Sequence, residues 1–332
     1  MPPVEAFAPC RADLAGGTLD IWPLGILHPG SLTVNAALPL GVRLIVEPGG
    51  APEGAVLHSV GGGKERLLGP AEAATDLTAA VVFHLRPAAG VAVRVLEQAP
   101  VGSGLGGSSA YGMALASALL ALEGRTVEAA RLVAVVRDLE ARVLGAPAGC
   151  QDHWAAVKGG VLAVHLEPGG ERVERLAVDP AWLAERLTVF YTGITHHSGM
   201  VNWEVIRRRL EGDPATTAAL EAIAAAARDC RAALLAEDEA GVGAAIVAEW
   251  TARRTLAPEV SPPELERVVE AGLGAGALAV KACGAGGGGS VLLWHGPGLR
   301  ETLATALAVA APGGGVLASG VSERGVVVTP LG

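Results

Sequence analysis

A short stretch crowded with glycine and serine, PVGSGLGGSSAYG, runs from Pro100 to Gly112. The residues before it, VAVRVLEQA, alternate as in a strand, and an apolar helical pattern begins at Ser108. Where side chains are missing, backbone N–H groups can approach a ligand closely, and the N-terminus of a helix adds partial positive charge. The stretch therefore predicts a cradle for an anion such as a nucleotide phosphate. The simpler interpretation is a tight loop that needs positive φ angles.

Three more segments carry residues suited to chemistry. APCRADLAGGTLD holds Arg11 and Asp20, and LGAPAGCQDHWAAVKGG holds Asp152 shortly after a predicted helix that contains Glu140. The third segment, KACGAGGGGS, begins at Lys281 and is almost bare of side chains, so we expect its glycines to pack against the first stretch. Lys281 either reaches the phosphates or pairs with an acid.

Gly102, Gly104 and Gly107 also fit the G-x-G-x-x-G fingerprint of dinucleotide-binding proteins. The match lies about a third of the way along the chain, and the flanking elements do not form a clear βαβ unit, which disfavours a nicotinamide oxidoreductase. A Walker P-loop is absent, because Gly63 and Lys64 are followed by glutamate.

The P-x-x-x-G-L-G-x-S-S-A pattern, with APCRADLAGG upstream and KACGAGGGGS downstream, resembles the GHMP kinases. That family includes galactokinase, homoserine kinase, mevalonate kinase and phosphomevalonate kinase. The three motifs follow the family's order and span almost the whole chain. AGGTLD is most similar to the A-G-G-x-T-D of heptose-7-phosphate kinases and fucokinase-like enzymes, with Leu19 where that branch has threonine. Galactokinases place a Glu-His pair at Gly17 and Thr18, which argues against galactokinase itself.

The resemblance implies an α+β fold with two domains and an active site in the cleft between them. A ribosomal S5 domain 2-like ATP-binding domain is expected over residues 1–184 and a ferredoxin-like GHMP kinase domain over residues 185–332. The order of predicted elements independently favours two α+β layers over a regularly alternating parallel sheet. Residue patterns predict a helix over 126–144 with Thr126 as its N-cap, and two strands around a turn within 32–48.

The resemblance also implies phosphoryl transfer from ATP with Mg²⁺. Asp152 would accept or orient the proton of the attacking hydroxyl, and Arg11 would hold that carboxylate ionised. Ser108 and Glu140 would bind Mg²⁺, with Ser109 as the neighbouring alternative to Ser108. The loop expected to wrap the ATP phosphates consists of Gly102, Ser103, Gly104, Leu105, Gly106, Gly107, Ser108 and Ser109. Helix capping is the simpler role for the two serines and for Asp152.

Substrate contacts are expected from two places. Asp20 matches the sugar-contacting acid of the family, and Gly17 lies in the same turn. The polar segment YTGITHHSGM resembles a substrate-side loop of the heptose-kinase branch, so Tyr191, His196 and His197 are predicted to contact sugar hydroxyls or a phosphate. Histidines of an exposed loop are the alternative interpretation.

Composition limits the other possibilities. The chain of 332 residues carries a net charge of −9 and no basic stripe with aromatic residues, so nucleic-acid binding is disfavoured. No apolar run approaches the roughly 20 residues of a membrane span, and MPPVEAF lacks the features of a secretory signal. Four cysteines lack metal-site spacing. We expect a cytoplasmic protein, monomeric or homodimeric, without membrane or nucleic-acid partners.

The sequence thus predicts an ATP- and Mg²⁺-dependent kinase that phosphorylates a hydroxyl, with the anomeric one as the first guess, of a sugar or sugar phosphate. One alternative is a mevalonate-type alcohol kinase, whose more apolar pocket would not need Asp20. Another is a sugar- or nucleotide-binding regulatory protein on the same fold. The presence of Asp152, Ser108 and Glu140 favours an enzyme.

Overall fold

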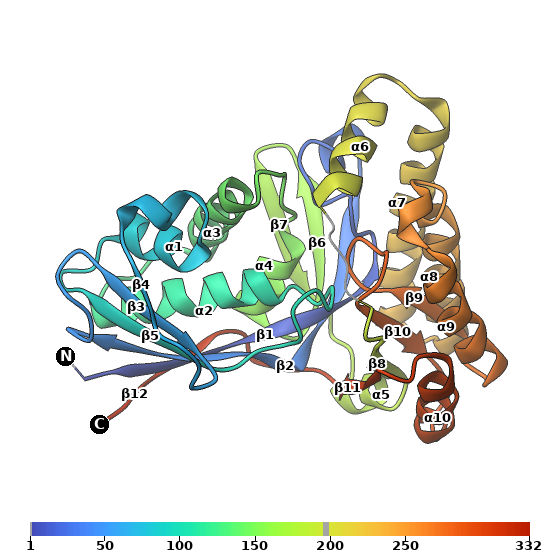
Figure 1. Ribbon diagram of the computed structural model, residues 1–332. Coiled ribbons are helices and arrows are strands. Elements are labelled where there is room, and N and C mark those ends of the chain that lie inside the picture. The colour runs from blue at the N-terminus through green and yellow to red at the C-terminus, as the bar shows by residue number, and fades with distance from the viewer. Residues whose placement is uncertain (1, 195–198) are drawn as a thin grey trace.

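In the computed structural model of the protein, residues 2–194 and 199–332 are described, without the side chains of 199–201, 318 and 319. Two sheets lie at opposite ends of the molecule, each with its own helices (Figure 1). The larger sheet has the strand order β12-β1-β2-β5-β3-β4, with β6 beside β2 and β7 beside β6. Its strands are β1 (Val4–Ala15), β2 (Leu32–Pro48), β3 (Val56–Val60), β4 (Arg66–Leu68), β5 (Val91–Glu97), β6 (Val161–Glu167), β7 (Gly170–Arg175) and β12 (Val327–Pro330).

The prediction of two strands around a turn within residues 32–48 was wrong, because β2 is one long strand. Its first part, residues 32–36, pairs with β6, and its second part, residues 43–48, pairs with β5. β1 follows it along both parts, with an irregularity between Pro9 and Arg11. At Gly41 a side chain would collide with the carbonyl oxygen of Ala8. Glycine therefore serves a close approach of two strands here instead of a turn.

The second sheet is antiparallel and has the order β11-β8-β10-β9. Its strands are β8 (Leu187–Tyr191), β9 (Ala279–Ala282), β10 (Ser290–Trp294) and β11 (Gly315–Ser319). The helices of this half are α5 (Pro180–Ala184), α6 (Gly199–Leu210), α7 (Pro214–Leu235), α8 (Glu239–Arg253), α9 (Pro263–Gly274) and α10 (Arg300–Ala310). Among the described helices, none combines the length and apolar character needed to cross a membrane.

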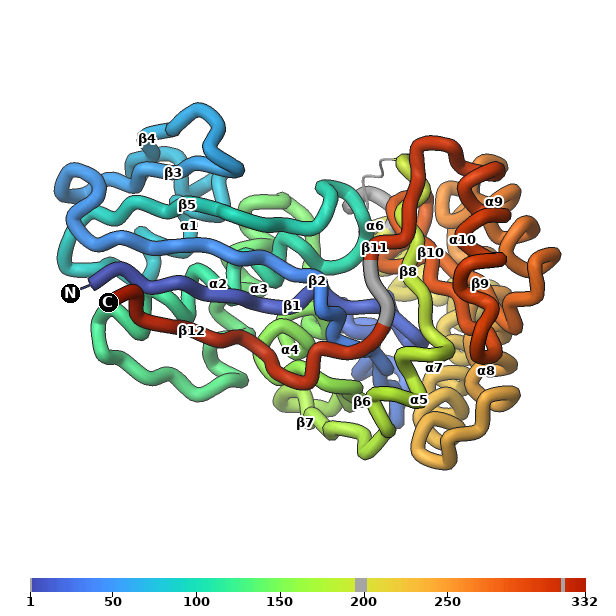
Figure 2. The backbone as a smooth tube through the Cα atoms, turned by 90° about the horizontal axis from the view of Figure 1, so that it is seen from below, coloured from blue at the N-terminus to red at the C-terminus, as the bar shows by residue number. Residues whose placement is uncertain are grey.

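The end of the chain returns to its beginning. β12 pairs antiparallel with β1, from Val4 with Pro330 to Phe7 with Val327. The two termini therefore lie side by side at the far edge of the larger sheet (Figure 2). The division into domains at residue 184 stays a prediction, and this last strand adds residues 327–330 to the sheet of the first half.

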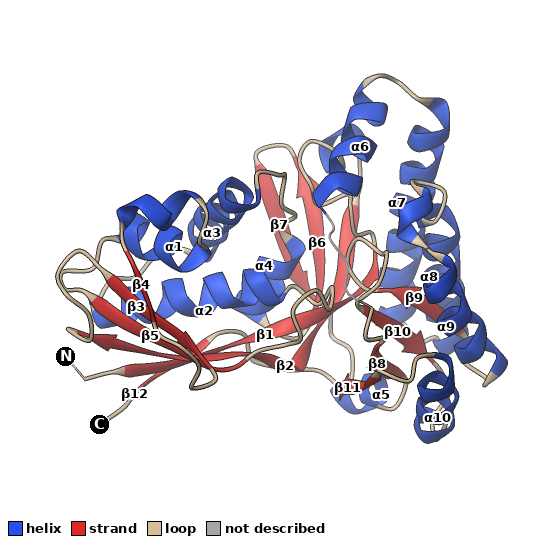
Figure 3. Cartoon of the chain, in the orientation of Figure 1, coloured by secondary structure: helices blue, strands red, loops and turns tan. Residues whose placement is uncertain are grey.

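Helices cover one face of the larger sheet (Figure 3). They are α1 (Leu77–Leu85), α2 (Gly107–Leu122), α3 (Ala129–Leu144) and α4 (Gln151–Lys158). α3 turns Leu132, Val133, Val136 and Leu139 inward, the spacing of an amphipathic helix. Its N-cap is Glu128, whose side chain accepts from the Ala130 N–H, so the prediction of Thr126 as the cap was wrong by two positions.

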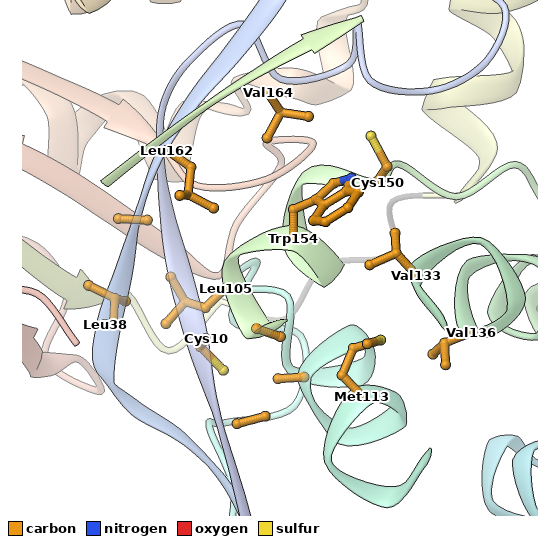
Figure 4. Packing of buried hydrophobic residues seen from close by; sticks show 14 of the residues in the cluster. Cys10, Leu38, Leu105, Met113, Val133, Val136, Cys150, Trp154, Leu162 and Val164 are labelled. Atoms are coloured by element: carbon orange, nitrogen blue, oxygen red, sulfur yellow. The ribbon is translucent and has the colours of Figure 1, made fainter. Parts of the chain in front are cut away.

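The core beneath these helices also anchors the glycine-rich stretch. Leu105 is fully buried, and its side chain lies near Cys10 and Leu38 in the packed interior (Figure 4). Its carbonyl oxygen accepts a hydrogen bond of 3.0 Å from the backbone N–H of Arg11. One apolar side chain and one strand-like bond thus hold a loop of glycines against β1.

Candidate active site

The segments singled out in the sequence converge on one pocket of about 750 Å³. It is lined from both halves of the chain: by parts of residues 11–21, 98–111, 140–152 and 283–288, by Leu77 of α1 and by Asn202 of α6. All the predicted loop residues from Gly102 to Ser109 line it. The four motifs are far apart in sequence, so only the fold brings them together.

The glycine-rich stretch needs glycine for its backbone conformation. Gly102, Gly104 and Gly106 have φ angles of 74°, 73° and 73°, a region that side chains disfavour. The stretch is therefore a tight loop that needs positive φ angles, as the simpler interpretation holds. Such a loop can also be a cradle for an anion. α2 begins at Gly107 with Gly106 as its N-cap and without a side-chain cap. The first N–H groups of α2 therefore remain free of a capping side chain at the edge of the pocket.

The two serines at the start of α2 do not cap it. Ser108 is exposed and lines the pocket, whereas Ser109 is buried and donates a hydrogen bond of 2.8 Å to Oε2 of Glu140. Nε2 of His153, which is fully buried, lies 3.0 Å from the same oxygen. Burial alone would raise the pKa of Glu140, but the contacts with His153 and the two serines outweigh it and lower the pKa below its usual value. Glu140 is thus an ionised carboxylate at the wall of the pocket.

Arg11 and Asp152, which are 141 residues apart in sequence, form an ion pair. Oδ1 of Asp152 lies 2.7 Å from Nε and 2.6 Å from Nη2 of Arg11. Nη1 of Arg11 donates to the carbonyl oxygen of Gly104 at 2.6 Å, so the same guanidinium also fixes the glycine loop. Burial raises the pKa of Asp152 above its usual value although Arg11 opposes the shift. The carboxylate is held by one partner and poised to take up a proton.

Asp20 lines the same pocket as Asp152 and is near enough to feel the negative charge of Asp152. Its Oδ2 accepts a hydrogen bond of 3.0 Å from the backbone N–H of Gln151. Burial, and then the negative charge of Asp152, raise the pKa of Asp20 to about 6. Gly149 passes so close that a side chain there would collide with the Asp20 carboxylate. Two interacting carboxylates of raised pKa therefore line the pocket.

The segment KACGAGGGGS, residues 281–290, packs against the glycine-rich stretch 100–112, as predicted. The carbonyl oxygen of Cys283 would lie 2.6 Å from a Cβ at Gly104, and that of Gly102 would lie 2.7 Å from one at Gly289. Backbone approaches this close are open only to glycine. Lys281 was expected either to reach the phosphates or to pair with an acid. It is fully buried and pairs with Asp13 and Glu249, which do not line the pocket.

One predicted substrate contact, Tyr191, is not supported by the position of the residue. Gly17 lines the pocket, but Tyr191 does not. Tyr191 ends β8, where pairing with Ser290 of β10 and Gly315 of β11 holds it within the second sheet. His196 and His197 lie outside the described residues.

Other pocket residues escaped the sequence analysis. Gln151 precedes Asp152 in LGAPAGCQDHWAAVKGG, and only this position next to a predicted catalytic residue pointed to it. His153, on the other side of Asp152, is fully buried and acts on the pocket through its contact with Glu140. Tyr111 stands on α2, where its hydroxyl lies 2.7 Å from that of Thr78. Asn202 enters from α6 without any local pattern that could have marked it.

We expect Gly106→Ala to unfold at lower urea concentration than the wild type. A Cβ at this position would lie 2.8 Å from Oδ2 of Asp152 and 2.9 Å from its Cβ and Cγ, and Arg11 keeps Asp152 from moving aside. With the added strain of positive φ, the expected loss in the free energy of unfolding is roughly 2 to 4 kcal/mol. Gly107→Ala is the matched control, since its Cβ would meet only Ala99, at 3.9 Å. Equal stability of the two variants would contradict this account.

Family models match two parts of the chain. The model described as the GHMP kinases N terminal domain matches residues 72–160, and the one described as GHMP kinases C terminal matches residues 230–311. Together they span more than half of the chain. The chain belongs to the GHMP kinases, a family of phosphotransferases that act on alcohol groups. The predicted family and its two-domain α+β fold are thereby confirmed.

Individual relatives agree with this assignment. The D-glycero-alpha-D-manno-heptose 7-phosphate kinase of Campylobacter jejuni is 27% identical over 216 residues, which are 63% of this chain and 62% of that protein. The bifunctional fucokinase/GDP-fucose pyrophosphorylase of Arabidopsis thaliana is 26% identical over 86% of this chain and 29% of its own length. The chain thus spans less than two thirds of either relative.

A solved structure extends the comparison to the fold. Lactococcus lactis galactokinase, complexed with galactose, superposes with a TM-score of 0.80 at 15% sequence identity, covering 99% of this chain and 95% of its own. At this level of identity the likeness shows the fold alone.

Proposed function

We propose that this GHMP kinase transfers the γ-phosphoryl group of ATP, with Mg²⁺, to a hydroxyl of a sugar or sugar phosphate. The observation that carries the proposal is the Arg11–Asp152 ion pair, whose arginine also binds the carbonyl oxygen of Gly104. It joins a carboxylate of raised pKa to the loop predicted to hold phosphates. The kinase names of the two sequence relatives support the same reaction class.

The residues present fit a nucleotide with its metal. The loop 102–107 and the uncapped start of α2 offer backbone N–H groups to phosphates. Glu140, ionised, and the exposed hydroxyl of Ser108 are oxygen donors of the kind that Mg²⁺ prefers. When bound, ATP supplies the phosphoryl group and Mg²⁺ neutralises charge on the phosphates. Leu77, Ala99 and Val101 add apolar lining that suits the adenine base.

The two aspartates that line the pocket suit a substrate with several hydroxyl groups. In the proposed reaction Asp20 accepts a hydrogen bond from one of them. Asp152 takes the proton of the attacking hydroxyl as the new oxygen–phosphorus bond forms, while the bond from the γ-phosphorus to the bridging oxygen breaks and ADP leaves. Arg11 keeps the carboxylate in place and favours its ionised form before the reaction. The anomeric hydroxyl is the proposed acceptor, which extends the resemblance to the heptose-kinase branch.

We expect Asp20→Asn to be more stable than the wild type near neutral pH and a poorer enzyme. The folded-state pKa of about 6 lies above the unfolded value near 3.8, so folding favours the protonated form. The stability from this preference is present at low pH and is lost as the pH rises through 6. Asparagine removes the buried charge, and the gain reaches about 3 kcal/mol at most.

The measurement is the free energy of unfolding of both proteins at several pH values, together with the KM for the sugar. The stability gain should grow from low pH and level off above pH 6. The KM should rise because one acceptor for a hydroxyl is weakened. A gain that is independent of pH would show that the pKa of Asp20 is the same in the folded and the unfolded protein.

The proposed function is tested by ADP release with Mg·ATP against a panel of sugars, sugar phosphates, mevalonate and homoserine. We expect turnover of one sugar or sugar phosphate. Turnover of mevalonate alone would establish the alcohol-kinase alternative. Binding of ATP and sugar without turnover would favour the regulatory alternative, and a protein that does not bind ATP would refute the proposal.

A further inference from the structure

Four charged side chains are buried together behind the pocket. Asp13 of β1, Glu249 and Arg253 of α8, and Lys281 of β9 are each at most 1% exposed. Nζ of Lys281 lies 3.0 Å from Glu249 and 3.4 Å from Asp13, and Arg253 pairs with both acids as well. Two positive and two negative charges balance, which makes their burial tolerable. We call these residues the buried charge cluster.

Arg253 differs from Lys281 in its remaining contacts. Its Nη1 donates to the carbonyl oxygen of Gly284 at 2.9 Å and to the hydroxyl of Thr18 at 3.4 Å. Gly284 and Thr18 both line the pocket, whereas Arg253 does not. The further hydrogen bond of Lys281 within the described part of the chain goes to the carbonyl oxygen of Leu14 on β1, at 3.4 Å. Only one of the two cations thus reaches the pocket loops.

The loop on one side of Arg253 carries Asp20. Thr18 is held at a φ of 75°, which a residue with a branched side chain rarely adopts, so surrounding contacts must maintain it. Gly17, next to it, leaves room for the cluster, since a side chain there would collide with Asp13 and Arg253. The turn that leads to Asp20 is therefore shaped around the guanidinium.

The loop on the other side supports the glycine stretch. A Cβ at Gly284 would lie 3.0 Å from the carbonyl oxygen of Gly104, the same oxygen that Arg11 binds. The planar guanidinium presents several N–H groups in a fixed arrangement, so it can bind two acids and two loops at once. Lysine, a point charge on a flexible stem, cannot reproduce that arrangement.

We propose that Arg253 is a positioning residue, which fixes the loop carrying Asp20 relative to the glycine stretch 100–107. This role rests on the proposed function, because it aligns the sugar hydroxyl with the phosphoryl group of ATP. Misplacement of reacting groups by about 1 Å costs on the order of 10²-fold in rate. Loss of Arg253 therefore impairs turnover without removing any group that touches a substrate.

The chain offers a matched pair of variants. Arg253→Met and Lys281→Met each remove one positive charge from the cluster, so we expect similar losses of stability. Arg253→Lys keeps the positive charge but loses the planar guanidinium with its fixed arrangement of N–H groups. We expect kcat to fall about 10- to 10²-fold in Arg253→Lys, while the kcat of Lys281→Met stays near that of the wild type. If the methionine variants fail to fold, the kcat of Arg253→Lys compared with that of the wild type still tests the positioning role.

Hydrogen–deuterium exchange tests the same role without any turnover. We expect faster exchange at residues 16–20 and 284–289 in Arg253→Lys than in the wild type, and no such local change in Lys281→Met. Unchanged exchange in Arg253→Lys, or the same local increase in both variants, would overturn the proposal. If the wild type phosphorylated nothing in the substrate panel, the proposed function would fail. Hydrogen–deuterium exchange would still test whether Arg253 positions the two loops.

Discussion

Asp152→Asn is expected to lower kcat by about 10³-fold, within the range of 10²- to 10⁴-fold that a general base contributes. Asparagine has the same shape but cannot accept a proton from the attacking hydroxyl. The raised pKa of Asp152, caused by burial, makes it a stronger base than an exposed aspartate. Because the loop at residues 102–107 is unchanged, the affinity for ATP should stay close to that of the wild type.

The pH profile gives this prediction its second readout. In the wild type kcat/KM falls as the pH is lowered, because Asp152 and Asp20 become protonated. In Asp152→Asn, kcat/KM should fall less as the pH is lowered, because only the protonation of Asp20 remains to reduce it. A variant that kept a large part of the wild-type kcat would limit Asp152 to orienting the substrate.

Arg11→Lys completes this series as a graded variant. Lysine keeps the positive charge beside Asp152 but cannot also hold the Gly104 carbonyl oxygen with the same geometry. We expect a loss of kcat of about tenfold, smaller than for Asp152→Asn, since the base itself remains. A larger loss in Arg11→Lys than in Asp152→Asn would contradict the assigned roles.

Local features of the site could be predicted because they depend on backbone conformation. The glycines at 102, 104 and 106 are required by positive φ angles, and that need is visible in the residue types themselves. The pairing of Arg11 with Asp152 spans 141 residues, so no local pattern encodes it. The resemblance to a family supplied that contact, and the structure bears it out.

The failures came where tertiary contacts decide. The sequence predicts Tyr191 within a polar loop, but it is the last residue of β8, where pairing with strands on both sides keeps it in the sheet. The sequence predicts a turn within residues 32–48, but Gly41 in this segment serves the close approach of β1 to β2. The side chain of Lys281 is paired with acids of β1 and α8, and the sequence around Lys281 does not reveal these partners.

Glu140→Gln is expected to raise the Mg²⁺ concentration needed for half-maximal activity by about 10- to 100-fold. The side chain is ionised, 6% exposed, and held on Oε2 by Ser109 and His153. Glutamine keeps the shape and can still accept from Ser109, but it loses the charge that makes a carboxylate a good ligand for Mg²⁺. At saturating Mg²⁺ we expect kcat to remain lower by about 10²-fold, because charge on the phosphates is less well neutralised.

Asp138→Asn is the control, because Asp138 lies two positions earlier on α3 with a side chain that is 72% exposed. It removes an equal charge from the same helix without changing the pocket, so its Mg²⁺ dependence should match that of the wild type. ATP affinity measured with Mg²⁺ and with EDTA separates binding of the metal from turnover. The wild type should bind ATP more tightly with Mg²⁺, and Glu140→Gln should lose most of that difference. An unchanged difference in Glu140→Gln would assign the carboxylate to the packing of α2 on α3, through Ser109, and not to the metal.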